Sequence, residues 1–218
     1  MYQEAPQNIL IFGPQALAFN QDSFHDLRAC IADSSLLGWV HNVVAELPDR
    51  FNDVSDKIPQ LGIIPGASLL KALSQQLETG SLTSIMAVPH LPNIVLTPLC
   101  VISHLASYTR YLELRYNRSG WEAWKNKKNM SSNTDIVGFC TGLLAALAVS
   151  LSGDLEDFEK YGATAIRLAM MIGAVVDAED AMNGSSGSFS AAWRTKEGLR
   201  NMETIIQENH DVSEKFYK

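Results

Sequence analysis

Two short, continuous apolar runs stand out along the chain. One covers residues 8–12 (Asn-Ile-Leu-Ile-Phe) and ends at Gly13 and Pro14, and the other covers residues 135–139 (Asp-Ile-Val-Gly-Phe). Apolar runs of this length, closed by turn residues, are typical of strands that are buried on both faces of a parallel sheet. The pattern therefore predicts two β-strands, separated by a long region of another character.

Most other apolar residues recur three and four positions apart, which is the spacing of one face of an α-helix. Phe24, Leu27 and Ile31 show this spacing near the N-terminus. Helices are predicted over residues 22–32, 36–47, 67–77, 95–116, 141–151, 158–176 and 195–208. Helices that separate strands indicate an α/β fold with a parallel sheet, although two strands are few for a complete sheet.

Prolines, basic residues and small polar residues mark the expected connections. Three prolines between positions 48 and 65 predict that residues 47–66 are mostly loop, with room for a short helical piece near Asp53. Residues 117–133 carry three lysines and one arginine among serines and asparagines, which indicates a solvated connection. Residues 184–190 form a Gly- and Ser-rich stretch without the lysine of a phosphate-binding loop, so we expect a flexible linker there.

The composition is that of a globular protein, because 46% of the 218 residues are hydrophobic and 19% are charged. The net charge of -7 argues against nucleic-acid binding, which needs a basic surface.

Three widely spaced cysteines form no disulfide framework or metal motif and favour a reducing, cytoplasmic environment. There is no secretory signal pattern, and apolar stretches such as residues 142–151 are too short to span a membrane. We expect one domain over residues 1–218, without a bound cofactor or metal and without membrane contact.

One motif carries chemistry: Gly138-x-Cys140-x-Gly142, between the second predicted strand and a helix rich in Ala and Leu. This is the pattern of a nucleophile elbow, a tight strand-to-helix turn that strains the backbone of its central residue. Glycines two positions away relieve the close contacts of such a turn. The turn lifts the side chain above the edge of the sheet where ligands bind. We therefore predict that Cys140 is a nucleophile that carries an acyl group as a thioester.

The helix that follows Cys140 strengthens this prediction. Free N–H groups and the dipole at a helix N-terminus stabilise a thiolate and an oxyanion. The backbone N–H of Thr141 is the first expected oxyanion donor, and a second donor must come from elsewhere in the chain. The alternative interpretation of Cys140 is a buried cysteine in a Gly-flanked turn. Cys30 and Cys100 lie within helical patterns without such a turn, and we expect them to be buried small hydrophobic residues.

Several stretches of the chain, taken together, resemble one family. Residues 11–15 (Ile-Phe-Gly-Pro-Gln) are similar to a first strand followed by a Gly-x-Gln turn, and residues 138–148 (GFCTGLLAALA) to a Gly-x-Cys-x-Gly elbow with its helix. With residues 101–108, 163–176 and 187–193, they resemble the starter-unit:acyl-carrier-protein transacylase domain at the N-terminus of fungal iterative non-reducing polyketide synthases. The resemblance covers nearly the whole chain and implies an acyltransferase-like (α/β-hydrolase-like) parallel sheet flanked by helices.

The resemblance also implies a role for each site residue. Cys140 would take an acyl starter unit from a thioester donor such as an acyl-CoA and pass it to the phosphopantetheine arm of an acyl carrier protein in polyketide biosynthesis. Gln15, just after the first strand, would help to build the oxyanion hole near Thr141. CoA or phosphopantetheine would arrive with the substrate and would not be a resident cofactor.

The helix after the elbow bears on the charge of the acyl group. Related malonyl-specific acyltransferases hold the substrate carboxylate with an arginine in this helix. The nearest arginine here is Arg167, and the corresponding position falls near Ala169 or Met170. Because apolar side chains cannot stabilise a buried carboxylate, we expect an uncharged starter unit.

The chain departs from the family at the general base. The family's histidine lies beyond the elbow, after an inserted ferredoxin-like subdomain, and this chain stops at Lys218, about where that subdomain should begin. His210, the histidine that follows Cys140, is expected to face solvent, and His104 is the next to examine because its helix should pack near the elbow strand. The chain is therefore expected to be the incomplete, N-terminal portion of a transacylase domain. A cysteine-nucleophile thioesterase or hydrolase, and a truncated or non-catalytic fragment, remain alternative interpretations.

Overall fold

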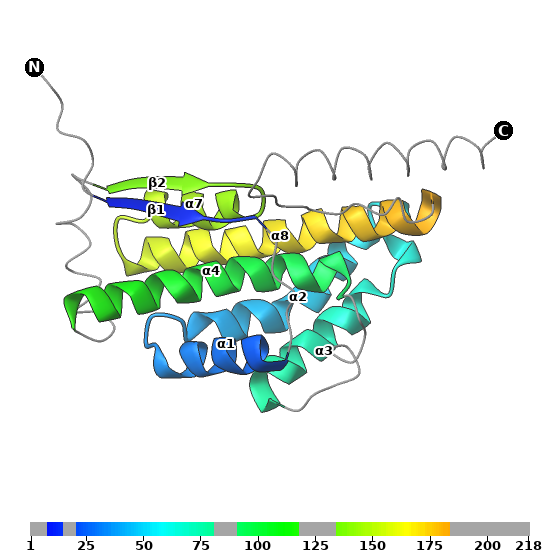
Figure 1. The fold of residues 1–218 in the computed structure, drawn as a ribbon. Coiled ribbons are helices and arrows are strands. Elements are labelled where there is room, and N and C mark those ends of the chain that lie inside the picture. The colour runs from blue at the N-terminus through cyan, green and yellow to red at the C-terminus, as the bar shows by residue number, and fades with distance from the viewer. Residues whose placement is uncertain (1–7, 15–20, 81–90, 118–133, 184–218) are drawn as a thin grey trace, which may run out of the picture. The chain divides into compact units, whose positions relative to one another are not determined.

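The structure is a computed structural model of the chain, and it describes residues 8–14, 21–80, 91–117 and 134–183 (Figure 1). Contacts divide the chain into Met1–Ser185 and Ser186–Lys218, so every described residue belongs to the first unit. Some of the predictions above concern residues outside this part of the chain: Gln15, His210, the basic segment 118–133, the linker 184–190 and the helix 195–208.

Two parallel strands form the sheet of the described residues. β1 (Asn8–Phe12) and β2 (Thr134–Gly138) pair with Phe12 opposite Gly138. Because the strands are parallel, their C-terminal ends lie at the same edge of the sheet, where β2 runs into the turn that holds Cys140. Both predicted strands and the parallel pairing are confirmed, whereas the wider acyltransferase-like sheet stays a prediction.

Helices make up most of the described fold. They are α1 (Gln21–Asp33), α2 (Trp39–Ser55), the 3₁₀ helix η1 (Pro59–Ile63), α3 (Gly66–Thr79), α4 (Asn93–Tyr116), α7 (Gly142–Leu151) and α8 (Leu155–Asn183). Figure 1 shows α4 and α8 side by side beneath the sheet, with α1, α2 and α3 on the side of α4 away from the sheet. The first layer below the strands is therefore built by α4, α7 and α8.

The centre of the core lies along α4 and α8. Leu99, Ile102 and Leu105 of α4 and Ile166 and Ala169 of α8 are all completely buried. Small residues on α8 let the two helices approach closely, as at Gly173, where a Cβ atom would overlap the backbone of the first turn of α4. The helices that support the sheet are thus tightly packed against each other.

The prediction that residues 47–66 are mostly loop is wrong, because α2 continues through Pro48 to Ser55 and η1 covers Pro59–Ile63. The helical piece expected near Asp53 is part of α2. A proline inside a helix removes one backbone hydrogen bond and crowds the preceding turn. Here Val44, Leu47 and Phe51 all bury their side chains on one face of α2. That burial of apolar surface outweighs the local cost of the proline. Pro98 is likewise tolerated inside α4, beyond its first turn.

Asp177 of α8 holds the N-terminus of α4. Its Oδ1 accepts hydrogen bonds from the backbone N–H and the side-chain amide of Asn93, both at 2.9 Å. Its Oδ2 accepts a third from the backbone N–H of Ile94 at 2.8 Å. A carboxylate at a helix N-terminus satisfies N–H groups that have no partner within the helix. Asp177 thereby fixes where α4 begins relative to α8.

One described helix, α8, is long and apolar enough to cross a bilayer by length and composition alone. The expectation that every apolar stretch is too short therefore fails for this helix. Half of its most apolar window is buried against the rest of the fold, however, and core helices pass the same test. The finding is weak evidence for a membrane span.

Candidate functional site

Cys140 lies in a strand-to-helix turn. β2 ends at Gly138, α7 begins at Gly142, and Cys140 between them has a φ of 53°, in the left-handed region. Non-glycine residues rarely adopt this conformation, because Cβ then crowds the following carbonyl group. The side chain of Cys140 is exposed and its thiol is free. The fold therefore presents this thiol to solvent on a strained backbone.

The two glycines of the motif are required by close backbone contacts. A Cβ atom on Gly138 would lie 2.5 Å from Cα of Leu143 and 2.8 Å from Cβ of Ala146. A Cβ atom on Gly142 would overlap the backbone carbonyl groups of Phe12 and Gly13. Glycine at these positions lets α7 start directly against the ends of both strands, which is the crowding that the motif predicts.

Backbone hydrogen bonds fix the turn, and they do not use the N–H of Thr141. Phe139 N–H donates to the carbonyl of Phe12 at 2.9 Å, and Gly142 N–H donates to the carbonyl of Phe139 at 3.0 Å. Leu143 N–H donates to the carbonyl of Cys140 at 3.0 Å. The N–H of Thr141 finds no acceptor among the described residues. The role of this N–H as an oxyanion donor stays a prediction.

The hydroxyl group of Thr141 is buried. The residue is 8% exposed, and its Oγ1 has no hydrogen-bond partner within the described residues. A buried hydroxyl without a partner is uncommon in folded proteins. The predicted donor at this position is the backbone N–H, and the hydroxyl points away from solvent.

Gln15 lies just outside the described residues, whereas the strand that precedes it is described. β1 ends beside β2, and the carbonyl groups of Phe12 and Gly13 contact the start of α7 at Gly142. Pro14 is the last described residue before Gln15. The first strand thus delivers the chain to the turn at Cys140, while the role of Gln15 in an oxyanion hole stays a prediction.

Cys100 of α4 is a neighbour of Cys140 that sequence patterns did not reveal. The residue is buried, and this burial raises the pKa of its thiol to about 11, with a further contribution from a Cys140 thiolate. Such an electrostatic interaction requires the two sulfur atoms to be close. Cys100 and His104 are four positions apart, so both lie on one face of α4. Only the packing of α4 beneath the sheet brings this face to Cys140.

His104 faces β1 from the same helix. Its ring lies edge-to-face with the ring of Phe12, with 5.9 Å between centroids. Burial lowers the pKa of the imidazole, and its Nδ1 is buried without a hydrogen-bond partner among the described residues. No hydrogen bond joins it to Cys140 within this part of the chain. His25 and His41 are exposed on α1 and α2, so none of the described histidines is bonded to the thiol.

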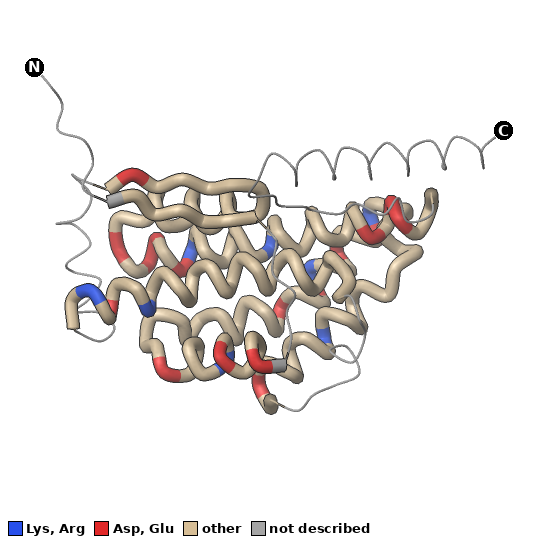
Figure 2. Tube along the Cα trace, viewed as in Figure 1, with Lys and Arg blue, Asp and Glu red and all other residues tan. Residues whose placement is uncertain are grey.

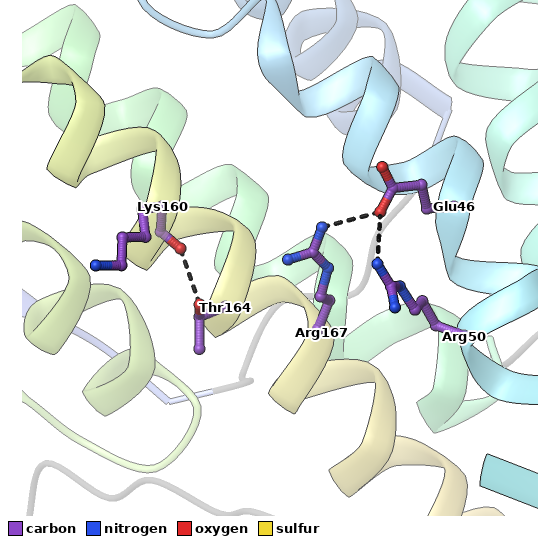
Figure 3. A network of polar contacts seen from close by, with 5 residues as sticks. All are labelled: Glu46, Arg50, Lys160, Thr164 and Arg167. Carbon is purple, nitrogen blue, oxygen red and sulfur yellow. Dashed lines mark hydrogen bonds and ion pairs between the residues drawn. The ribbon is translucent and has the colours of Figure 1, made fainter. Parts of the chain in front are cut away.

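The first arginine after the motif is engaged elsewhere. Arg167 of α8 donates from its guanidinium to the carboxylate of Glu46 on α2 at 2.9 Å. Figure 3 shows Arg50 approaching the same carboxylate, at 3.7 Å. Ala169 and Met170, where the family's arginine position was expected, are both buried in the core. The Arg167 guanidinium is therefore tied to α2.

The chain matches a known family over almost its whole length. The sequence profile described as "Starter unit:ACP transacylase in aflatoxin biosynthesis" matches residues 10–214. Because this match includes both strands, the Cys140 turn and the helices around it, the chain belongs to the starter unit:ACP transacylase family. The family membership inferred from the elbow and the Gly-x-Gln turn is confirmed.

Similar full-length proteins are fungal synthases. The chain is 40% identical over 204 residues to the non-reducing polyketide synthase pigA of Monascus ruber, with 92% of this chain aligned. It is 39% identical over 206 residues to the non-reducing polyketide synthase epaA of Aspergillus niger, and 35% identical over 210 residues to the 3-methylorcinaldehyde synthase tropA of Talaromyces stipitatus, with 94% of the chain aligned in both cases. The chain spans only 7–8% of the length of these relatives.

Proposed function

We propose that this chain handles the starter unit of a fungal polyketide synthase and forms an acyl thioester on Cys140. In the proposed reaction, an uncharged acyl group passes from a thioester donor such as an acyl-CoA to Cys140. It then passes to the phosphopantetheine thiol of an acyl carrier protein. The observation that carries the proposal is the exposed Cys140 thiol on a left-handed turn at the start of α7. Family membership supplies the class of reaction.

The proposed steps balance as two thiol exchanges. The Cys140 thiolate attacks the carbonyl carbon of the donor thioester, and the tetrahedral intermediate expels the donor sulfur, which leaves as a thiol with the proton that Cys140 gave up. The phosphopantetheine thiol then attacks the acyl-Cys140 carbonyl, and its proton returns to the Cys140 sulfur. The N–H of Thr141 has no acceptor among the described residues, which supports this route because a free donor could stabilise the oxyanion of each intermediate.

The proposal of an uncharged acyl group rests on α8. Holding a malonyl carboxylate would need a cation, because a buried carboxylate without a partner is strongly destabilised. Arg167 is bonded to Glu46, and Ala169 and Met170 are apolar and buried. These contacts favour an acetyl or a longer, uncharged chain over a malonyl group.

The proposal is tested by intact-mass analysis. The chain is mixed in turn with acetyl-CoA, hexanoyl-CoA and malonyl-CoA, and an acyl adduct is expected with the first two. Cys140→Ala should form none, whereas Cys30→Ala, which changes a cysteine of α1, should be acylated like the wild type. An adduct of equal size on Cys140→Ala would refute the covalent role, and a malonyl adduct that forms as fast as the acetyl one would refute the uncharged starter.

A second stage separates transfer from hydrolysis. The acylated chain is mixed with a phosphopantetheinylated acyl carrier protein, and the acyl mass should move to the carrier. Loss of the acyl group to water at the same rate without a carrier would instead identify a thioesterase. A general base typically contributes about 10²–10⁴ in rate. With no described histidine bonded to Cys140, we expect acylation to be observed more readily than rapid turnover.

A further inference from the structure

A second thiol lies beneath Cys140, on the helix that supports the sheet. The contact between Phe12 of β1 and His104 of α4 fixes how these two elements align, with 5.9 Å between the ring centroids. Gly138 of β2 is the residue paired with Phe12. Figure 1 shows α4 running in the opposite direction to both strands. The turn beyond the strand ends is therefore underlain by the residues of α4 that precede His104.

Similar steps along the chain lead from these contacts to the two cysteines. Cys140 is two residues beyond Gly138, which is at most about 7 Å at the rise of a strand. Cys100 is four residues before His104, which is about 6 Å along the axis of α4 and on the same face. Cys100 thus lies below the turn that holds Cys140. Burial raises the pKa of the Cys100 thiol and a Cys140 thiolate raises it further, which agrees with this position.

The two thiols differ in their access to solvent. Cys140 is exposed at the start of α7, whereas only 5% of the surface of Cys100 is exposed. Neither the Cys140 turn nor α4 before Arg110 carries a charged residue, and Figure 2 shows this uncharged stretch of the fold. An accessible cysteine with a second, resolving cysteine beside it is the arrangement found in many redox sensors. The pair therefore has the features that oxidation to a disulfide requires.

We propose that Cys140 and Cys100 form a disulfide when the chain meets hydrogen peroxide. The Cys140 thiolate attacks one oxygen of the peroxide, the O–O bond breaks, and hydroxide leaves and takes up the proton that Cys140 had released. Cys140 is then a sulfenic acid. The Cys100 sulfur attacks the Cys140 sulfur, its proton goes to the departing hydroxyl group, and water leaves. The two thiols lose two electrons in total, and the peroxide is reduced to two molecules of water.

The turn at Cys140 is the part that moves when the bond forms. A disulfide needs the two Cα atoms within about 7 Å of each other. Cys100 is held within α4 between Leu99 and Val101, which are both completely buried. Cys140 lies between two elements in a left-handed conformation, which leaves it a more relaxed one to adopt. Formation of the disulfide therefore draws Cys140 towards α4 and removes its thiol from the surface.

The disulfide would act as a reversible block on starter loading. Cys140 cannot accept an acyl group while its sulfur is bonded to Cys100, and a thiol reductant restores both cysteines. This consequence rests on the proposed function, whereas formation of the disulfide does not.

The test is intact-mass analysis and non-reducing peptide mapping of the chain after treatment with hydrogen peroxide. The wild type should lose about 2 Da, and the mapped link should join the peptides that contain Cys140 and Cys100. Dithiothreitol should reverse the change in mass. Cys30→Ala is the matched control, because the Cys30 thiol donates to the carbonyl of Ala106 on another part of α4, and this variant should lose the same mass.

Variants of the two cysteines give opposite expected results. Cys140→Ala should keep its reduced mass. In Cys100→Ala the sulfenic acid has no resolving thiol, so Cys140 should gain about 32 Da as a sulfinic acid. A wild-type link that includes Cys30, a link between two chains, or a wild-type Cys140 that becomes sulfinic acid as fast as in Cys100→Ala would overturn the proposal. The wild-type peptide map alone decides the matter where Cys100→Ala does not fold.

Acetyl-CoA separates this proposal from the proposed function. The reduced chain should be acylated at Cys140, and the oxidised chain should not be acylated until dithiothreitol is added. A reduced chain that is never acylated would refute the proposed function and leave the mapped disulfide standing. An oxidised chain that is acylated as fast as the reduced one would overturn the assignment of Cys140 to the disulfide.

Discussion

Replacing Asp177 with alanine should destabilise the fold by about 3 kcal/mol. The carboxylate accepts three hydrogen bonds at 2.8–2.9 Å from Asn93 and Ile94. Ile94 is completely buried, so in the variant its N–H group would have neither water nor Asp177 as a partner. An unsatisfied buried donor costs about 1–3 kcal/mol, and loss of the charge at the helix N-terminus adds about 0.3–1 kcal/mol. The two hydrogen bonds to Asn93 are lost as well, and together these contributions give a loss in unfolding free energy of about 3 kcal/mol.

The assay is thermal and urea unfolding followed by circular dichroism. For a chain of this size, about 3 kcal/mol corresponds to a fall in Tm of roughly 6–12 °C. Asp177→Asn keeps an acceptor oxygen without the charge and should lose about half as much, because hydrogen bonds to charged groups are roughly twice as strong as neutral ones. Asp53→Ala is the matched control, because Asp53 is exposed on α2 and has no partner among the described residues. It should change the stability by less than about 0.5 kcal/mol.

Two outcomes would refute this account of α4. One is an Asp177→Ala variant whose free energy of unfolding lies within about 0.5 kcal/mol of the wild type, the range expected for an ordinary surface change. The other is an equal loss in Asp53→Ala, which would assign the effect to the removal of any carboxylate from this acidic chain. Either result would mean that the hydrogen bonds of the Asp177 carboxylate do not determine where α4 begins.

Three further predictions concern the neighbourhood of Cys140. Gly142→Ala should cost about 1–3 kcal/mol in unfolding free energy, because its methyl group would overlap two backbone carbonyls at the end of β1, whereas Gly153→Ala has room and should be neutral. Mass-resolved labelling with a maleimide at about pH 8 should modify Cys140 first and Cys100 last. Cys100 is buried with a pKa of about 11, so roughly 0.1% of it is thiolate at that pH. Faster labelling of Cys100 than of Cys140 would contradict the packing of α4. Burial lowers the pKa of His104, so its contribution to stability is complete above its unfolded pKa of about 6.5 and is lost as the pH falls below that value. His104→Phe should therefore lose less stability between about pH 7 and pH 5 than the wild type, and an equal loss in urea unfolding would show that this imidazole is not desolvated.

The parts of the fold that follow from local chemistry were predictable from the sequence. Both strands appear as apolar runs, and the turn at Cys140 follows from its two flanking glycines, since each glycine marks a contact that a methyl group would break. Helical periodicity located the helices of the described residues to within a few positions at most ends. The length of α2 was missed, because Pro48 is a local signal that argues for a break, whereas the burial of Leu47 and Phe51 depends on tertiary packing.

The surroundings of Cys140 were less predictable than the turn itself. The proximity of Cys100 depends on how α4 crosses beneath the sheet, and nothing in the helical pattern of α4 distinguishes this cysteine from a core residue. The bonding of Arg167 to Glu46 joins two helices that are far apart in the sequence. Spacing patterns report which residues share a face of one element, but they do not report which faces meet.

The left-handed backbone at Cys140 makes the turn a compromise between stability and chemistry. An L-residue in this conformation costs roughly 1–2 kcal/mol relative to a right-handed one. Folded proteins are stable by only about 5–15 kcal/mol in total. Glycine would relieve the strain but would remove the sulfur atom. The residue that would best suit the backbone is thus one that could not form a thioester, and the fold retains a measurable local instability at the position from which it exposes its thiol.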